Sequence, residues 1–511
     1  MKAKNQSLEM GILKGIRVLD LSRMLSGPYA TMLLADHGAE VIKIESAEGD
    51  TSRRSGPFEK KDVRGDWSGY FISLNRNKKS ISLNLKNRDD IVFLKKLIKK
   101  SDVLVENFRP GVMKRLGLSF DEVSKINPRI VYGSINGFGS EIFGESPYKN
   151  WPSYDVVAQA MGGLISLTGY DEETPLKVGP GIADIFSGSL LSFGLLASIL
   201  KSRETRRAQF VEVAMYDAIV SMCERAIYQY DFNNVIPRPE GNGHPLLAPF
   251  GIYSAKDGFV AIGIVEDSYW VVLKKIINFD DLLNDLKYGT IALRAQNRNE
   301  LNKKINLWTK QFSKKELVKL LGGKVPFGPV NNVKEIFEDA HIRKRNMILE
   351  IERPFGGGKS WKVAGNPIKF KGFKSLNLRP PLLGEHKELY VNNFGSIISN
   401  KPTIFFQPQK KDYSCTITIR TTDRSVSEFY DCSYTWLKSK ENYLICSLEK
   451  SKFVPLENSV SAVSFNFSKV IEEKDNHKEA IDNLNINLSM RDICEISFVH
   501  TEVEILITAK T

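Results

Sequence analysis

The chain has 511 residues, 42% of them hydrophobic and 26% charged, with a mean hydropathy of −0.23, which is typical of a globular protein of about two to four domains. It contains no uncharged apolar run of about 18 residues and no apolar segment after its N-terminus, so we expect neither a membrane span nor secretion. The formal net charge of +12 favours acidic partners, namely nucleic acid, an anionic membrane or phosphorylated small molecules.

The first 200 residues alternate between short apolar runs and amphipathic segments. A strand is expected at 16–21, and a helix opens at 26–28, where proline suits the first helical turn. Residues 89–100 have helical spacing. This alternation predicts an α/β fold with a parallel, doubly wound sheet. Further strands are expected at 39–45, 80–85, 102–106 and 130–135.

From residue 251 the pattern is typical of a smaller α+β unit. A strand is expected at 259–264 and helices at 266–277 and 297–322. Residues 326–329 are interpreted as a linker, after which 330–390 returns to a mixed pattern.

The last 111 residues differ in kind from the rest. Residues 401–511 contain 14 Lys and Arg against 16 Asp and Glu, a net charge of −2, whereas residues 1–400 carry +14. All 37 glycines precede residue 396. Short β-type runs at this spacing predict a sandwich or a barrel. Strands are expected at 415–421, 442–448, 461–467, 484–489, 494–499 and 502–508.

Several classes of site have no supporting motif. The five cysteines form no C-x-x-C pair and no ligand set with histidine, so no metal site is expected, and free thiols suit a reducing, cytoplasmic location. Residues 137–139 (G-F-G) follow a strand but lack the third glycine of the dinucleotide fingerprint. No phosphate-loop motif and no nucleic-acid-binding motif is present, so a nucleic-acid partner is not expected.

Asp184 stands at the start of an apolar helix that runs to about residue 202. Backbone N–H groups at a helix N-terminus stabilise negative charge. The carboxylate could therefore cap the helix. It could also act as an ionised nucleophile toward acyl donors, because the resulting anhydride or thioester stays activated. The second role requires a pKa that deep apolar burial does not raise.

Several segments of the chain, in their order and spacing, resemble the class III CoA-transferases (the CaiB/BaiF family) over residues 12–390. The matching segments are 15–22, 27–28, 36–45, 75–80, 102–111, 154–155, Asp184, 328–337 and 381–386. The resemblance implies a homodimer of two interlocked rings. Each chain would have a Rossmann-like large domain from 12–225 and 331–398 and a small α+β domain at 226–330. Residues 401–511 would be an appended β-rich domain without counterpart in typical members.

The resemblance also implies an activity. Asp184 would attack an acyl-CoA thioester, form an aspartyl anhydride and then an aspartyl-CoA thioester, and pass CoA to a free carboxylic acid. Coenzyme A would enter as acyl-CoA substrate, with no permanently bound cofactor. Residues 75–81 and 328–332 are similar to members that use succinate, so a dicarboxylate is a plausible acid.

Further site residues follow from the family pattern. Gly241, Gly243 and His244 match a glycine loop near the active site, or form a simple surface turn. Lys86 and Arg115 could equally be surface charges, and Arg76, Lys78 and Lys79 could form a solvated basic face. The positions implied to bind CoA are Leu25, Ser26, Leu83, Lys86, Asn107, Phe108, Arg115 and Tyr154.

Two alternatives remain open. An acyl-CoA racemase or isomerase could use the same fold, but family racemases carry a histidine where this chain has Tyr154, and proton exchange needs two bases. The other alternative is a non-catalytic scaffold that binds acyl-CoA and acts through the β-rich segment. The presence of Asp184 counts against it.

Overall fold

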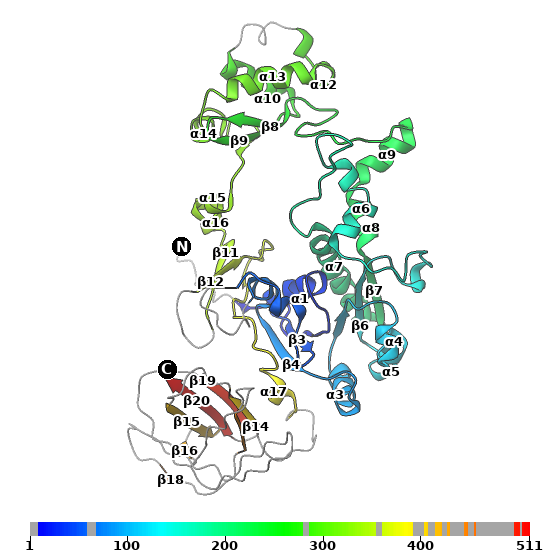
Figure 1. The fold of residues 1–511 in the computed structure, drawn as a ribbon, viewed down its shortest axis with the longest axis vertical. Helices are drawn as coiled ribbons and strands as arrows, with labels where there is room; N and C mark the ends of the chain where they lie inside the picture. The colour runs from blue at the N-terminus through cyan, green and yellow to red at the C-terminus, as the bar shows by residue number, and fades with distance from the viewer. Residues whose placement is uncertain are drawn as a thin grey trace, which may run out of the picture.

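The computed structural model describes residues 9–58, 68–278, 286–353 and 360–391, together with seven strands between residues 403 and 510. Its centre is a six-stranded, fully parallel sheet with the order β4-β3-β2-β5-β6-β7 (Figure 1). This is one of the two common doubly wound orders. The predicted parallel α/β sheet is therefore confirmed. The strands are β2 (Arg17–Asp20), β3 (Glu40–Glu45), β4 (Lys78–Ser82), β5 (Val103–Glu106), β6 (Val131–Asn136) and β7 (Gln209–Ala214).

Helices cover both faces of this sheet. Because side chains alternate along a strand, Val18 enters one core and its neighbour Leu19 enters the other. The first core lies under α1, α6, α7 and α8, and the second under α3, α5 and α17. Burial on both faces explains why the strands read as continuous apolar runs. The helices are α1 (Ser26–Asp36), α3 (Arg88–Lys99), α5 (Phe120–Ile126), α6 (Asp155–Met161), α7 (Ile182–Thr205), α8 (Met215–Met222) and α17 (Lys387–Val391).

Helix α7 has 24 residues and is, within the described ranges, the one helix long and apolar enough to cross a membrane by length and composition. The prediction from uncharged runs did not single it out. In this fold α7 packs against α1, β6 and β7. Its outer face nevertheless leaves Phe193 and Leu200 75% and 70% exposed.

A smaller unit has its own core around Trp270, Leu273 and Leu301. Its antiparallel sheet has the order β10-β9-β8, formed by β8 (Phe250–Ala255), β9 (Gly258–Gly263) and β10 (Phe327–Pro329). Helices α10 (Asp267–Ile277), α13 (Arg298–Thr309) and α14 (Lys314–Leu321) share its core, and α12 (Ile291–Gln296) contacts α13.

Two predictions for this unit were wrong. The single helix expected over 297–322 is two helices, because Ser313 and Glu316 form a capping box that starts α14 anew. The linker expected at 326–329 contains edge strand β10, where Pro329 is tolerated because an edge strand needs no further N–H donor on its open side.

Two connections join the units on opposite sides (Figure 1). The outgoing one contains α9 (Glu224–Asn233). The returning one contains α15 (Val333–Glu338) and α16 (Ala340–Lys344) and leads into the hairpin of β11 (Ile348–Ile351) and β12 (Trp361–Ala364).

The returning chain is bound to the large unit by buried polar groups. Asp36 accepts hydrogen bonds from the guanidinium of Arg76 (2.9 and 2.6 Å), from Asn77 (2.7 Å) and from Asn366 (3.1 Å). The backbone N–H of His386 donates to the carbonyl of Ser80 on edge strand β4 (2.9 Å). Residues 366–386 thus complete the large unit from far along the sequence.

The same contacts correct the expectation of a solvated basic face at 76–79. Arg76 pairs with Asp36, and Lys78 pairs with Asp20 at 2.9 Å with both side chains fully buried. Only Lys79 is substantially exposed, beside Glu40.

Beyond residue 391 the described residues are strands alone, of which β15 (Ser414–Thr421), β20 (Val503–Lys510) and β19 (Glu495–His500) pair antiparallel in that order. They coincide with three of the predicted strands. The strands expected at 461–467 and 484–489 lie outside the described residues, and the appended β-rich domain stays a prediction. The other strands are β14 (Thr403–Phe406), β16 (Ser427–Phe429), β17 (Leu444–Ser447) and β18 (Val454–Pro455).

Replacing Asp36 by asparagine should lower the free energy of unfolding by about 3–5 kcal/mol, because Arg76 would remain buried without its counter-charge. Urea unfolding followed by circular dichroism measures the change. The control is Glu204→Gln in the exposed Lys201–Glu204 pair, which should leave stability nearly unchanged. Equal stability of Asp36→Asn and the wild type would contradict this role.

Candidate active site

The candidate site lies at the carboxyl ends of β2 and β5, where the strand order reverses. Asn107, just after β5, accepts a hydrogen bond from the N–H of Arg23 and donates to its carbonyl, both at 2.8 Å. Its amide also donates to the Ser26 hydroxyl (3.4 Å), and the Arg23 guanidinium stacks on the Phe108 ring at 4.7 Å. Such a reversal point is the usual ligand crevice of a doubly wound sheet. The structure thus brings together Ser26, Asn107 and Phe108.

Asp184 is the third residue of α7, and it does not cap that helix. The cap position is Gly181, and the N–H of Ala183 donates instead to Asp155 Oδ1 at 2.8 Å. The hydroxyl of Ser26, the first residue of α1, lies close enough to the Asp184 carboxylate to lower its pKa. Asp184 therefore lies at the N-terminal ends of both α1 and α7, where backbone N–H groups favour a negative charge.

Two glycines allow this close approach. A Cβ atom at Gly188, one turn after Asp184, would lie 2.6 Å from the Ser26 carbonyl oxygen. A Cβ at Gly181 would lie 2.7 Å from the Leu25 side chain. A side chain at Gly188 would meet backbone, so it would push α1 and α7 apart and separate Ser26 from Asp184, whereas one at Gly181 would displace the Leu25 side chain.

The pKa of Asp184 is raised to about 6. Burial is the main cause, the neighbouring Asp155 carboxylate adds to it, and the Ser26 hydrogen bond opposes it. The expectation that burial would not raise this pKa was wrong, because Asp184 lies between two packed helices. A pKa of about 6 still leaves roughly 90% of the carboxylate ionised at pH 7.

Two further residues belong to the site and were missed from the sequence. Asp155 accepts bonds from Ala183 and from the Gln159 amide (2.6 Å). Tyr70, in α2 (Gly69–Asn75), has its pKa raised to about 12 by burial and by the carboxylates of Asp184, Asp50 and Asp155. Its phenol therefore stays protonated as a donor. The 154–155 motif pointed to Asp155 only as a matching segment, and nothing in the sequence marked Tyr70.

The predicted glycine loop lies beside α9 and the loop around Gly169. The N–H of Gly241 donates to the Gly169 carbonyl at 2.9 Å, and Gly243 makes a turn bond to Glu240. The His244 ring lies 3.3 Å from the Arg225 guanidinium and packs on Phe250. A role of this loop next to Asp184 stays a prediction.

The remaining predicted CoA-binding residues differ in exposure. The Leu83 side chain lies in the second core, so only its backbone is available to a ligand. Lys86 and Arg115 are exposed, and Tyr154 immediately precedes α6 with 65% of its surface exposed. Leu25 lies against Gly181 at the start of α7.

Fold and site together define an α/β enzyme with an ionisable carboxylate at the ligand edge of its sheet. The chain belongs to CoA-transferase family III, which matches residues 13–387. The family resemblance is thus confirmed, and the protein is a CoA-transferase, an enzyme class that acts on CoA thioesters.

Individual relatives agree with this assignment. The chain is 40% identical over 387 residues to the succinyl-CoA:mesaconate CoA-transferase of Haloarcula marismortui, covering 76% of this chain and 97% of that protein. It is 34% identical over 377 residues to the succinyl-CoA:glutarate CoA-transferase of Mus musculus, covering 73% and 84%. The crystal structure of a CaiB/BaiF family protein from Brucella suis matches with a TM-score of 0.67 and 31% identity, covering 76% of this chain and 100% of that one.

A role of Asp184 as nucleophile predicts that the rate of CoA transfer falls as the pH drops through about 6, because protonation takes up the electron pair that a carboxylate needs for attack. This fall in rate is the acid limb of the pH–rate profile. In Asp155→Asn the acid limb should move to lower pH, since the variant removes a negative charge next to Asp184 and keeps an oxygen that accepts the Ala183 N–H. A pH–rate profile of kcat/KM measures both.

Glu204→Gln, at the far end of α7, is the matched control and should leave the profile in place. An acid limb that stays in place in Asp155→Asn would contradict the coupling of the two carboxylates.

Proposed function

We propose that this enzyme transfers CoA from an acyl-CoA thioester to a free carboxylic acid, with Asp184 as the nucleophile. The supporting observation is a carboxylate in the first turn of α7, next to the start of α1 on the ligand edge of the sheet. A pKa of about 6 leaves this carboxylate largely ionised at neutral pH. Two relatives are named for succinyl-CoA. We therefore assign succinyl-CoA as donor and a second dicarboxylic acid as acceptor.

The donor half-reaction has two steps. An Asp184 carboxylate oxygen attacks the thioester carbonyl carbon. The C–S bond breaks, CoA leaves as a thiolate, and a mixed anhydride between Asp184 and the donor acid remains. The thiolate then attacks the aspartyl carbonyl carbon of that anhydride. The donor acid leaves as a carboxylate, and an aspartyl-CoA thioester remains.

The acceptor half-reaction runs the same steps in reverse. A carboxylate oxygen of the acceptor attacks the aspartyl thioester and releases CoA thiolate. The thiolate attacks the acceptor's carbonyl carbon in the new anhydride, which releases Asp184 as a free carboxylate and the product as acyl-CoA. Every step conserves charge and needs no external oxidant or reductant.

Local donors serve the oxyanions that form in each attack. The candidate donors are the Ser26 hydroxyl and the protonated Tyr70 phenol, both close enough to Asp184 for one group to change the pKa of the other. The exposed cations Lys86 and Arg115 and the stacked Arg23 are suited to the phosphates of CoA.

Incubation with succinyl-CoA and hydroxylamine should convert Asp184 to a hydroxamate, because hydroxylamine captures both acyl-aspartyl intermediates. Peptide mass spectrometry locates the label. Asp184→Asn should lose transfer by at least about 1,000-fold and show no label. Asp155→Asn, with the neighbouring carboxylate removed, should still be labelled at Asp184. A label on another carboxylate, or turnover retained in Asp184→Asn, would refute this mechanism.

We also propose that the chain works as a homodimer. Large apolar side chains are exposed along α7 and α9, among them Phe193, Leu200, Tyr230 and Phe232. Exposed apolar surface on this scale is typical of an association site. A second copy is the expected occupant, since the family resemblance implies interlocked rings and the two units here are joined by two separate connections (Figure 1).

Replacing Phe193 and Phe232 together by aspartate should halve the molar mass in size-exclusion chromatography with light scattering, because both charges would be buried in the interface. Leu307→Asp, at a side chain that is also exposed but lies on α13 of the smaller unit, is the control and should keep the dimer mass. Circular dichroism checks that each variant is folded. A folded double variant that keeps the dimer mass would contradict the assigned surface.

A further inference from the structure

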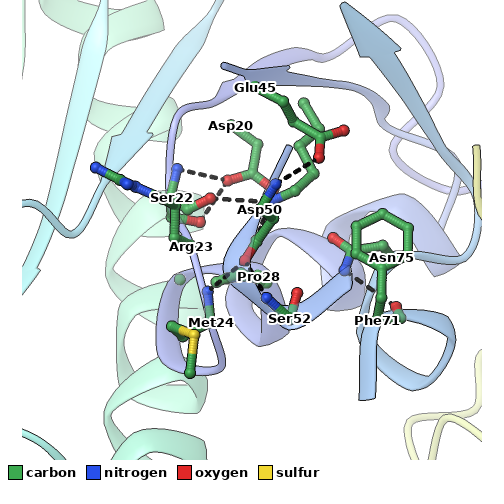
Figure 2. Close-up of polar contacts among 12 residues, drawn as sticks. Asp20, Ser22, Arg23, Met24, Pro28, Glu45, Asp50, Ser52, Phe71 and Asn75 are labelled. Carbon is green, nitrogen blue, oxygen red and sulfur yellow. Dashed lines mark hydrogen bonds and ion pairs between the residues drawn. The ribbon is translucent and has the colours of Figure 1, made fainter. Parts of the chain in front are cut away.

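The turn between β2 and α1 has an unusual backbone that an outside group holds in place. Met24 adopts φ = 66°, a region that residues other than glycine rarely occupy. Its N–H donates to Asp50 Oδ1 at 3.2 Å, as Figure 2 shows. Asp50 lies in the loop that follows β3, so a residue from the loop after the neighbouring strand fixes this turn.

Asp50 is itself part of a fully buried ion pair. Its Oδ2 lies 2.8 Å from Lys43 Nζ, and neither side chain is exposed. Its Oδ1 also accepts the N–H of Ser52 at 2.9 Å. Lys43 Nζ donates in addition to the carbonyl of Ser22 at 2.8 Å. The pair therefore holds the turn at two points, the carbonyl of Ser22 and the N–H of Met24.

The turn leads directly to the nucleophile. Leu25 and Ser26 follow Met24, and the Ser26 hydroxyl lies close enough to the Asp184 carboxylate to lower its pKa. Ser26 is 4% exposed and packed against α7 at Gly188, so its position depends on the turn that precedes it.

We propose that Asp50, paired with Lys43, is a positioning residue for the reaction: it holds residues 22–25 so that the Ser26 hydroxyl stays bonded to Asp184. Asp50 acts through Met24 and Ser26 and does not touch the substrate. This proposal rests on the proposed function, in which Asp184 is the nucleophile.

A positioning role and a purely electrostatic role of Asp50 predict opposite shifts in the pH dependence of the rate. The Ser26 hydrogen bond lowers the pKa of Asp184, so losing that bond moves the acid limb of the rate to higher pH. Removing the negative charge of Asp50 without moving Ser26 would move the limb to lower pH, if it moved at all. Asp184 has two other titratable neighbours, Asp155 and Tyr70. The titratable neighbours of Lys43, besides Asp50, are Asp20, Glu45 and Lys78.

The decisive experiment is a double-mutant cycle in the pH–rate profile. Asp50→Ala removes both acceptor oxygens and should raise the midpoint of the acid limb by about half to one pH unit. Ser26→Ala should cause the same shift. The double variant should shift no further than either single variant, because Asp50 acts through Ser26. The expected kinetic signature is a kcat lower by about tenfold with KM little changed.

An acid limb that stays in place or moves to lower pH in Asp50→Ala would overturn the proposal, as would full additivity in the double variant. Asp36→Asn is the matched control, because it breaks a different buried ion pair and should lower stability without moving the limb.

Should Asp50→Ala fail to fold, the paired variant Lys43→Met/Asp50→Leu replaces it in the test. It removes the ion pair, the bond to the Ser22 carbonyl and the acceptor for the Met24 N–H, and it leaves neither member of the pair as an unpaired buried charge, which is the condition under which loss of a buried pair is tolerated. An upward shift of the limb supports positioning, and an unshifted limb overturns it. Asp184→Asn is assayed in parallel: turnover retained there refutes the proposed function itself, whereas lost turnover with an unmoved limb in the Asp50 variants refutes only the role of Asp50.

Discussion

The close contact between α1 and α7 is the constraint on which the site depends. Gly188 allows α7 to approach the first turn of α1, and this contact places Asp184 next to Ser26. Because α1 follows β2, the contact also ties the carboxylate to the point where the strand order reverses. The pKa of Asp184 follows from the same contact, since the packing that brings the Ser26 hydroxyl close also removes water from the carboxylate.

Buried ion pairs stabilise the strands and turns next to this contact. Lys43–Asp50, Lys78–Asp20, Arg53–Glu45 and Arg76–Asp36 all lie around β2, β3 and β4, with little or no exposed side-chain surface. Burying charge is costly unless each partner is satisfied. The two lysines are further satisfied by backbone carbonyls, since Lys43 donates to the carbonyl of Ser22 and Lys78 to that of Pro28. The positive charge of the body is therefore partly internal, and fewer cations than the sequence suggests are left for an anionic ligand.

The parts of this structure that local sequence dictates were predictable. Apolar runs such as the one containing β3 were placed to within a residue or two, because strands buried on both faces leave a local signal. Asp184 was located because helix starts and glycine-rich turns are also local. The burial of Arg76 and Lys78 was not predictable, because their acidic partners Asp36 and Asp20 lie 40 and 58 residues away. The capping role of Asp155 and the raised pKa of Asp184 were missed for the same reason, since both arise only when α6, α7 and α1 meet.

The segment that returns to the large unit has a consequence for how the chain is made. His386 donates a hydrogen bond to edge strand β4, and Asn366 donates one to Asp36. Part of the large unit is therefore formed by residues that follow the entire smaller unit in the sequence. During synthesis from the N-terminus, the parallel sheet can assemble early while this edge remains uncovered. The smaller unit must then fold between the two halves of its neighbour. Covering of the β4 edge is thus a late event in biogenesis, and an interruption of synthesis before residue 366 would leave an open strand edge available for aggregation.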